Sequence, residues 1–347
     1  MKTVSVVMAT HNGEEYLSEQ IDSILAQSYP VYELIIQDDC STDNTTDLVR
    51  RYMEKYPFIK LFANEHNVGF NENFRLAALH ATGDFVALSD QDDIWFPQKL
   101  ERQVAAIGDA DICFSNTLDG EDPEHPMPML DRRYSFELIL LRNQVPGHTM
   151  LCRRDLVHDS KNWLGYIYYD WSLALHALLR NGLVKIDEPL NFHRRLSCSQ
   201  TYNPVRAVTW QSYIYGWRSY LFWQNYPPYE RLYAYLYEKT LGTRHTTANK
   251  MCRLILQHNL LSLLNLCWLC MKYRDVAYPT PPVPGLLGMV RGFFLPHMIT
   301  YQWRNSIYPK LSWGKSELEK NLYIIRLQKT TADDDNNTDS IGGNDHL

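Results

Sequence analysis

The chain has 347 residues, of which 45% are hydrophobic and 21% charged, so it is long and apolar enough to bury a sizeable core. Its 34 basic and 40 acidic residues give a formal net charge of −6, and residues 331–347 hold five Asp with no Lys or Arg. This balance argues against a nucleic-acid-binding protein, whose affinity depends on basic residues that neutralise phosphates.

Short β-branched runs alternate with helical patterns through the first part of the chain. Strands are predicted at residues 4–9, 33–36, 59–63, 84–89 and 111–115, with helical patterns between them. This alternation predicts an α/β fold with a mostly parallel sheet that is flanked by helices. Beyond about residue 204, dense aromatic residues at helical spacing, among them Trp210 to Tyr237, predict a C-terminal helical extension. The acidic residues 331–347 are predicted to be a disordered tail.

Three polar clusters follow predicted strands: Thr10-His11-Asn12, Asp38-Asp39 and Asp90-Gln91-Asp92-Asp93. Ligands of such sheets bind outside the carboxyl ends of the strands, so we expect the clusters to converge on one edge. Asp90 and Asp92 can approach one hard divalent cation, whose remaining ligands a diphosphate would supply. A capped turn before the next helix is the alternative interpretation of these acids.

Other candidate motifs are weaker. The turn after the first strand contains only Gly13, so the glycine triplet of dinucleotide-binding folds is absent. Gly314-Lys315-Ser316 lacks the earlier glycine and the preceding strand of a phosphate-binding loop. Cys267 and Cys270 lie in an apolar helical run, which favours buried core cysteines over a zinc site.

Five ordered segments in about the first hundred residues share their pattern with a known family. They are Val4–Gly13, Tyr16-Leu17, Asp38–Asp43, Asn67-Val68-Gly69 with Asn73-Phe74, and Ser89–Trp95. Through them the chain resembles family 2 glycosyltransferases of the GT-A fold, and the bacterial rhamnosyltransferase-like group in particular. A weaker match continues through Gly147–Met150, Tyr169–Trp171 and Glu188–Leu190. The resemblance implies a GT-A domain over residues 1–204 and a helical extension over 205–330.

The chain departs from the family pattern at three positions. Position 11 is His where Tyr is usual, and position 40 is Cys where Gly is usual. Position 196 is Leu where His often follows the region of Arg194.

The resemblance implies a role for each matching polar residue. Nucleotide-sugar contacts would come from six residues: Thr10, His11, Asn12, Asp39, Asn67 and Asp90. The Asp39 carboxylate would accept from the imide N–H of a uracil or thymine base, and Asp90 would lie near the ribose and diphosphate. Asp92 would be the direct ligand of Mn²⁺ or Mg²⁺. Asp170 would be the catalytic base, although a helix N-terminal acid is the alternative interpretation.

Acceptor contacts are assigned to Asp93, Trp95, His148 and Trp171. Trp95 and Trp171 have the shape to stack on sugar faces, but a core position is equally open for both. His148 is expected to contact the acceptor or a phosphate, with a loop histidine that bonds only to backbone as the equal alternative.

The expected function is a metal-dependent inverting glycosyltransferase for surface polysaccharide biosynthesis. The donor would be a nucleotide-diphosphate sugar of the UDP or dTDP type, with rhamnose as one candidate sugar, and the acceptor a glycan or lipid-linked saccharide hydroxyl. A metal would stabilise the departing diphosphate while a carboxylate takes the acceptor proton. Two rivals are a catalytically silent carbohydrate-binding or scaffold protein and a nucleotidyltransferase, which would need a basic phosphate loop after the first strand.

The expected location is the cytoplasm, with contact to the cytoplasmic face of the membrane as one option. Seven scattered cysteines argue against a disulfide framework, and the first apolar run is too short for a signal peptide. Leu260–Met271 is about 12 residues, short of the roughly 20 that span a bilayer. The apolar residues from Leu287 to Leu295 suit either a membrane interface or burial against the sheet domain.

Overall fold

The computed structural model describes residues 1–129, 134–196, 227–272 and 285–296. By its internal contacts the chain divides into residues 1–310 and 311–347, and only the first unit contains described residues. Several predictions therefore fall outside the described residues: the aromatic segment as far as residue 226, the domain boundary at 204, the 314–316 motif and the acidic tail.

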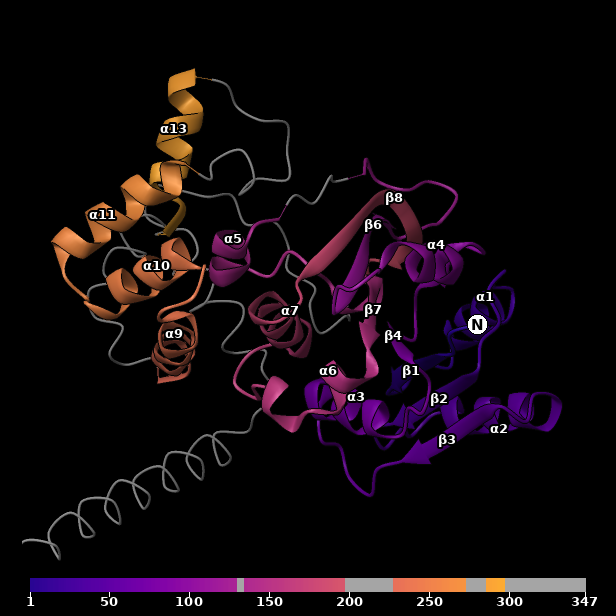
Figure 1. Cartoon of the computed structure of the whole chain (residues 1–347). Helices are drawn as coiled ribbons and strands as arrows, with labels where there is room; N and C mark the ends of the chain where they lie inside the picture. Colours follow the sequence, from indigo (N-terminus) through magenta and orange to yellow (C-terminus); the bar gives the residue numbers. More distant parts are fainter. Residues whose placement is uncertain (130–133, 197–226, 273–284, 297–347) are drawn as a thin grey trace, which may run out of the picture. The chain divides into compact units, whose positions relative to one another are not determined.

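The described residues contain one sheet of eight strands in the order β3-β2-β1-β4-β7-β6-β8-β5 (Figure 1). The strands are β1 Val4–Thr10, β2 Glu33–Asp38, β3 Ile59–Ala63, β4 Phe85–Ser89, β5 Ile94–Trp95, β6 Ile112–Gly120, β7 Met150–Arg153 and β8 Leu183–Arg194. Strands β3, β2, β1 and β4 are parallel, and so is the pair of β6 and β8. Strand β7 is antiparallel to β4 and β6, and β5 is antiparallel to β8.

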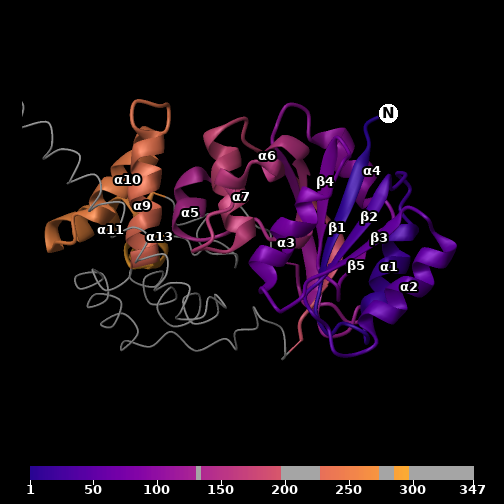
Figure 2. The same cartoon turned by 90° about the horizontal axis from the view of Figure 1, so that it is seen from below.

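Both faces of this sheet are buried, because successive side chains of a strand point to opposite sides. In β1, Val4, Val6 and Met8 belong to one core cluster and Val7 to the other. The first cluster lies under α1 (Leu17–Leu25), α2 (Thr45–Lys55) and α4 (Lys99–Ala106). The second lies under α3 (Phe70–Leu79), α6 (Arg154–His158) and α7 (Tyr169–Leu179). Figure 2 shows α1 and α3 on opposite sides of the strands.

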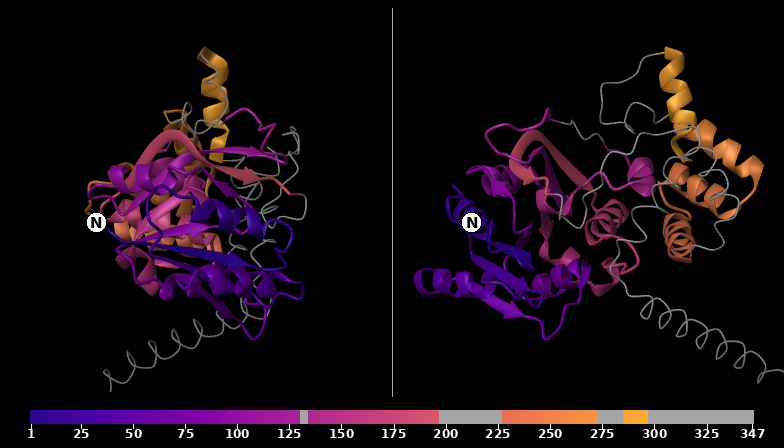
Figure 3. Two further views of the ribbon diagram at one scale, coloured as in Figure 1. Left: turned by 90° about the vertical axis from the view of Figure 1, so that its right-hand side faces the viewer. Right: turned by 180° about the vertical axis from the view of Figure 1, so that it is seen from behind.

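The α/β fold class is confirmed, and all five predicted strands are present. Strands β5, β7 and β8 were not predicted. Strand β8 carries Lys185, Asp187, Glu188 and Pro189, so its sequence lacks a clean period-two pattern. Its ribbon bends (Figure 3), and its register against β6 shifts on either side of Asn116. This bend matters because the last residues of β8 reach the site described below.

The predicted helical extension is confirmed for the part that the structure describes. It comprises α9 (Pro227–Thr240), α10 (Thr246–Leu256), α11 (Leu260–Met271) and α13 (Gly285–Phe293). The Tyr233 hydroxyl donates to the Leu140 carbonyl at 2.9 Å, at the end of α5 (Phe136–Leu141), and Tyr235 bonds to His176 of α7 at 2.8 Å. Cys267 and Cys270 are buried in the core of this part. Among the described helices, none has both the length and the apolar character to cross a bilayer.

Candidate functional site: an acidic cluster at the strand ends

The three polar clusters meet at the carboxyl edge of the parallel strands, as predicted. Thr10 of β1 is in register with Asp38 of β2, and Met8 pairs with Ser89 at the end of β4. Gln91 joins the outer loops: its Oε1 accepts from the His11 amide at 2.9 Å and its Nε2 donates to the His11 carbonyl at 3.1 Å. A Cβ at position 13 would meet the Gln91 amide group, so a larger residue there would displace the Gln91 side chain from this position.

The first two loops are tied together in conformations that favour glycine. The Asn12 amide donates to Ser41 Oγ at 2.9 Å, and the Thr42 amide donates to Asn12 Oδ1 at 2.8 Å. Asn12 has φ of 48° and Cys40 has φ of 61°. Asn tolerates this left-handed region, but a Cys pays roughly 1–2 kcal/mol there. The backbone at position 40 therefore accounts for the glycine that is usual in the family.

The two acids after β2 are engaged in the protein's own structure. Asp38 accepts from Thr10 Oγ1 at 2.9 Å and from the Ser41 amide at 2.8 Å, so Thr10 and Asp38 brace the loop. Asp39 is buried, and its carboxylate accepts from the amides of Val68 and Gly69 at 2.7 and 2.8 Å and from Asn64 Nδ2 at 2.8 Å. Asp39 therefore fixes the turn that follows β3.

His11, Asn12 and Asn67 are exposed at this edge. The His11 Nδ1 lies 2.8 Å from the Asp39 carbonyl oxygen, and Asn67 Nδ2 donates to the same oxygen at 3.4 Å. Of the six residues expected to contact the nucleotide sugar, these three offer exposed side chains, whereas Thr10 and Asp39 are buried.

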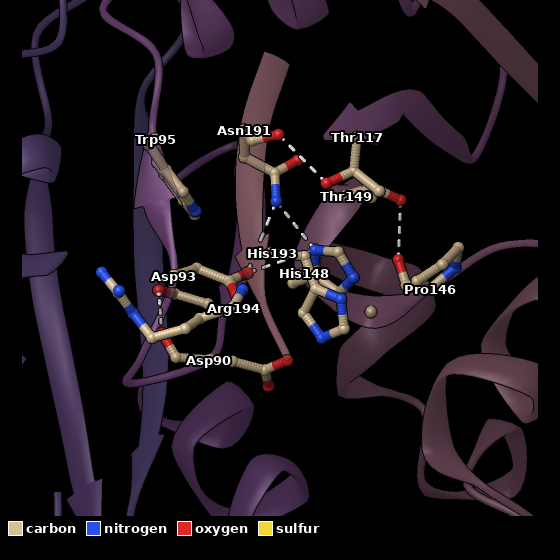
Figure 4. A network of polar contacts seen from close by, with 12 residues as sticks. Asp90, Asp93, Trp95, Thr117, Pro146, His148, Thr149, Asn191, His193 and Arg194 are labelled. Atoms are coloured by element: carbon tan, nitrogen blue, oxygen red, sulfur yellow. Dashed lines mark hydrogen bonds and ion pairs between the residues drawn. The ribbon is translucent and has the colours of Figure 1, made fainter. Parts of the chain in front are cut away.

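The carboxylates of Asp90, Asp92 and Asp93 form an acidic cluster beyond β4. Figure 4 shows Asp90 and Asp93 of this cluster. Asp93 is buried: its Oδ2 lies 3.2 Å from His148 Nδ1, and its Oδ1 accepts from the Arg194 amide at 3.3 Å. Burial would raise the pKa of Asp93, but the charges of His148 and His193 outweigh it and the pKa is lowered.

Asp90 and Asp92 are half-buried and lack such partners. Within the described part of the chain, the Asp90 carboxylate accepts no hydrogen bond, and the Asp92 carboxylate is bonded only to its own backbone amide. Burial, followed by the charges of Asp93 and Asp92, raises the pKa of Asp90 well above its usual range. Burial and the Asp93 charge raise the pKa of Asp92 to about 6. Two carboxylates are thus held close together, and neither forms an ion pair with a described residue, although the charge of His193 lowers the pKa of both.

Two basic residues at the end of β8, His193 and Arg194, also lie at the site. No role was predicted for either of them from the sequence. The His193 ring stacks on His148 with centroids 4.4 Å apart, and its Nδ1 lies 3.0 Å from Asp119 Oδ1. Burial lowers the pKa of His193, but the Asp119 hydrogen bond and the charges of Asp93, Asp119 and Asp90 overcome that effect and raise it. In Figure 4 the His193 ring and the Asp90 carboxylate point toward the same space.

Arg194 braces the cluster from the other side. Its Nε donates to the Asp92 carbonyl at 3.1 Å, its Nη2 lies 2.6 Å from Glu19 Oε2, and its guanidinium sits 4.5 Å from the centre of the Tyr16 ring. It is buried by these contacts. The signal that could have pointed to His193 and Arg194 is two adjacent basic residues at the end of a strand, but β8 itself was not recognised.

Asp170 joins the cluster from α7, where it is the second residue. Its Oδ1 accepts from the Trp171 amide at 2.7 Å and its Oδ2 from the Gly147 amide at 3.2 Å. Burial is the largest influence and raises the pKa of Asp170 to about 6, against the opposing effect of the hydrogen bonds from Trp171, Gly147 and Asn143. Its charge also raises the pKa of Asp90, so the two carboxylates are neighbours.

The residues assigned to the acceptor are buried, which corrects that expectation. Trp95 and Trp171 are 2% and 1% exposed, so neither presents a ring face on which a sugar can stack. The Trp171 Nε1 donates to the Ile139 carbonyl at 2.5 Å, and Lys99 lies 4.9 Å from the centre of the Trp95 ring. Asp93 and His148 are 1% and 4% exposed and bond to each other. All four therefore belong to the buried structure around the site.

The donor chemistry of the acidic cluster fits a hard divalent cation only in part. Carboxylate oxygens are ligands that Mg²⁺ and Mn²⁺ prefer, and Asp90 and Asp92 are the two acids of the cluster that form no ion pair with a described residue. Within the described ranges there is no group of three or more His, Cys, Asp or Glu side chains that could hold a metal ion. The protein would therefore supply one or two carboxylates, and a bound ligand would have to supply further oxygens.

Comparison with known proteins agrees with this architecture. Residues 5–157 match the model of "Glycosyl transferase family 2". Among similar sequences, EpsE of Bacillus subtilis is 46% identical over 105 residues, which cover 30% of this chain and 38% of EpsE. The Escherichia coli protein WfgD, "UDP-Glc:alpha-D-GlcNAc-diphosphoundecaprenol beta-1,3-glucosyltransferase", is 38% identical over 111 residues, which cover 32% of this chain and 43% of WfgD. The chain thus matches about two fifths of the length of these relatives.

The fold is shared with a solved structure. Residues 1–349 of S. aureus TarS, in complex with UDP-GlcNAc, superpose with a TM-score of 0.53 over 87% of this chain and 91% of that one, at 16% identity. At this identity the match concerns the fold alone. Residues 5–157, which carry the strand-end clusters, are thus similar to glycosyl transferase family 2.

Proposed function

We propose that this chain transfers a sugar from a nucleotide-diphosphate sugar to a hydroxyl of a glycan or lipid-linked acceptor, in surface polysaccharide biosynthesis. One observation carries the proposal. Asp90, whose carboxylate accepts no hydrogen bond from a described residue, lies close to Asp92 and to Asp170, whose pKa of about 6 leaves it mostly ionised at neutral pH. This edge thus combines a place for a cation and a diphosphate with a carboxylate suited to accept a proton.

The nucleotide is proposed to bind over the loops after β1, β2 and β3. His11, Asn12 and Asn67 are exposed there and can donate or accept hydrogen bonds. Asp39 Oδ1 already accepts two hydrogen bonds, from Val68 and Asn64, whereas Oδ2 accepts one, from Gly69. A base imide N–H would therefore bond to Asp39 Oδ2, which has room for a second donor.

A divalent metal ion, Mg²⁺ or Mn²⁺, is proposed to bind to Asp92 with help from Asp90. When bound, such an ion stabilises charge that develops on a leaving diphosphate. The protein's part is to hold two carboxylates in a half-buried position, where burial and the neighbouring Asp93 charge raise the pKa of both. Asp92→Asn should therefore weaken metal-dependent donor binding and leave metal-independent binding largely unchanged.

Asp170 is proposed as the base that takes the proton of the acceptor hydroxyl. The amides of Trp171 and Gly147 and the side chain of Asn143 fix the direction of its two oxygens, and a carboxylate with three such donors can accept one more, from an acceptor hydroxyl. Attack on the anomeric carbon from the face opposite the diphosphate would invert its configuration. A pKa near 6 suits this task, because the group is ionised at pH 7 yet basic enough to accept a proton.

The names of the similar proteins support a nucleotide-sugar donor. WfgD is named for UDP-Glc and a diphosphoundecaprenol-linked acceptor, and the TarS structure is a complex with UDP-GlcNAc. Specificity depends on a few contacts, so a dTDP donor such as dTDP-rhamnose stays within the proposal. The proposed compartment is the cytoplasm, at the face of the membrane, because seven scattered cysteines fit a reducing environment.

A donor panel tests the proposal. Thermal shift and donor hydrolysis would be measured with dTDP-rhamnose, UDP-glucose, UDP-galactose and GDP-mannose, each with Mg²⁺, Mn²⁺ or EDTA. We expect one donor class to stabilise the protein, with metal present, and to be turned over. Binding without turnover in the parent and in Asp170→Asn alike would indicate a catalytically silent binding protein. No stabilisation by any donor would contradict the proposal itself.

A further inference from the structure

Helix α13 exposes most of its large apolar side chains, whereas Phe293 at its end is partly buried against the core. Gly288 and Gly292 are buried, whereas Leu286 and Leu287 are 77% and 62% exposed, and Met289 and Val290 are also exposed. In a helix that packs on a protein core in water, the large apolar residues normally face the core. The reversed arrangement indicates that the outward face of α13 meets an apolar environment.

Helix α11 continues this face. Its buried side carries Leu263, Leu266 and Cys267, but Leu261 and Trp268 are 71% and 65% exposed. Helices α11 and α13 pack against each other (Figure 1), and the Trp268 ring lies 6.1 Å from the ring of Phe293, edge to face. We call this region, with the exposed residues Leu260, Leu261, Trp268, Leu286, Leu287, Met289 and Val290, the α11–α13 face.

The charges around the α11–α13 face have one sign. The described residues 241–272 and 285–296 contain no Asp or Glu, but they contain five basic residues, Arg244, Lys250, Arg253, Lys272 and Arg291. The first four are exposed. The whole chain has a net charge of −6, so these bases are a local excess and do not follow from its overall composition. Exposed apolar groups on α11 and α13 and an excess of cations, most of them on or beside α10, therefore occur in the same part of the chain.

We propose that the α11–α13 face docks on the surface of an anionic lipid bilayer. The apolar side chains would enter the boundary between headgroups and acyl chains, where Trp268 is well placed as an interfacial aromatic residue, and the basic residues would meet anionic headgroups. Docking on the surface, without spanning, fits the length of α11: 12 residues rise roughly 18 Å, against about 30 Å for the hydrocarbon core.

Charge favours lipid over a second copy of the chain. Two α11–α13 faces brought together would bury exposed apolar area, but they would also bring together two sets of cations, with no Asp or Glu in the described residues 241–272 and 285–296 to pair with them. An anionic surface satisfies both features at once. This docking does not depend on the sugar-transfer proposal, because it requires neither donor nor catalytic residue, although it would bring the enzyme to a lipid-linked acceptor.

Vesicle flotation of the full chain tests the docking. We expect binding to vesicles of seven parts phosphatidylcholine and three parts phosphatidylglycerol, weak binding to phosphatidylcholine alone, and weaker binding at high salt. Leu261→Gln with Leu287→Gln should lower the bound fraction at least tenfold, because both side chains are exposed and their loss leaves the core intact. Leu79→Gln, at an exposed leucine of α3, is the matched control and should bind as the parent does.

The contribution of charge has its own pair of variants. Lys250→Glu with Lys272→Glu should reduce binding to the anionic vesicles, whereas Arg51→Glu with Lys55→Glu, on the exposed side of α2, should not. Donor binding should be the same in all four variants, which separates this test from the sugar-transfer proposal. Failure of the parent to float with anionic vesicles would overturn the docking. So would equal flotation of the leucine variant, or light scattering that shows a dimer lost in that variant without any vesicle binding.

Discussion

The imidazole rings of His148 and His193 stack with their centroids 4.4 Å apart and their planes 16° from parallel. His148 comes from a short 3₁₀ turn, Gly147–Thr149, and His193 from the end of β8. Each ring has its own carboxylate, Asp93 for the first and Asp119 for the second. The stack therefore brings two ion pairs close to the acidic cluster, where the charge of His193 lowers the pKa of Asp90 and Asp92.

His193 is expected to set the pH range of metal-dependent donor binding. Its charge lowers the pKa of Asp90 and Asp92, opposing burial and the neighbouring acids, which raise it. His193→Gln removes that charge, so both carboxylates should protonate at higher pH and metal-dependent binding should fail at a higher pH than in the parent. Calorimetric titrations with UDP and Mn²⁺ between pH 5 and 8 would measure the shift.

His125→Gln is the matched control, because His125 pairs with Asp122 on an exposed loop. An unchanged pH profile for His193→Gln would show that its charge does not reach the two carboxylates.

Asp170→Asn should separate chemistry from binding. Asn keeps an oxygen for the Trp171 amide but cannot take a proton, so transfer should fall by roughly 10²–10⁴ while the donor dissociation constant stays the same. In the parent, transfer should rise as pH increases through about 6, because the ionised form is the base. Single-turnover transfer and donor binding, measured from pH 5 to 8, check both points. Near-normal transfer by the variant would leave Asp170 only as a helix-terminal acid.

Asp39→Ala should destabilise the fold as well as weaken nucleotide binding. The amides of Val68 and Gly69 would lose a buried acceptor, and each unsatisfied donor costs about 1–3 kcal/mol. Urea denaturation should therefore show a lower free energy of unfolding, and calorimetry a weaker affinity for UDP. Asp47→Ala, at an exposed acid of α2, serves as control. Unchanged UDP affinity would restrict Asp39 to its structural contacts.

The first half of the site could be predicted because it follows from local sequence. A polar cluster directly after an apolar run must lie at the carboxyl end of a strand, and parallel strands bring such ends together. Thr10, Asp38 and Asp90 were placed at one edge on this basis, and the register of β1, β2 and β4 confirms it.

The second half could not be predicted, because it depends on contacts between distant residues. Arg194 reaches Glu19 across 175 positions, and His193 reaches Asp119 across 74. Strand β8, which carries both, has a proline and three charged residues in its middle, so no period-two pattern reveals it. The burial of Trp95 and Trp171 could not be predicted either. A tryptophan in such a sequence can equally stack on a sugar ring or lie in the core.

Lys99 gives a prediction for stability as a function of pH. Its side chain is fully buried, with Nζ donating to the His148 carbonyl at 3.1 Å. Burial lowers the pKa of Lys99 to about 7, although the Asp93 charge opposes this. An unfolded chain has a lysine pKa of about 10.4, so between pH 7 and 10 the unfolded state binds more protons than the folded state. This residue therefore makes the free energy of unfolding rise with pH across that window and contributes no slope below it.

Lys99→Met removes the titrating group and keeps most of the side-chain volume. The free energy of unfolding of the parent, minus that of the variant, should increase by roughly 2 kcal/mol between pH 7 and pH 9. Urea denaturation at pH 7, 8 and 9 measures this difference, and Lys55→Met, at an exposed position on α2, should show none of it. Parallel pH dependence in the parent and Lys99→Met would mean that Lys99 stays charged when buried, held by Asp93 and the His148 carbonyl. The pH dependence of the free energy of unfolding therefore shows whether Asp93, a member of the acidic cluster, keeps the buried Lys99 charged.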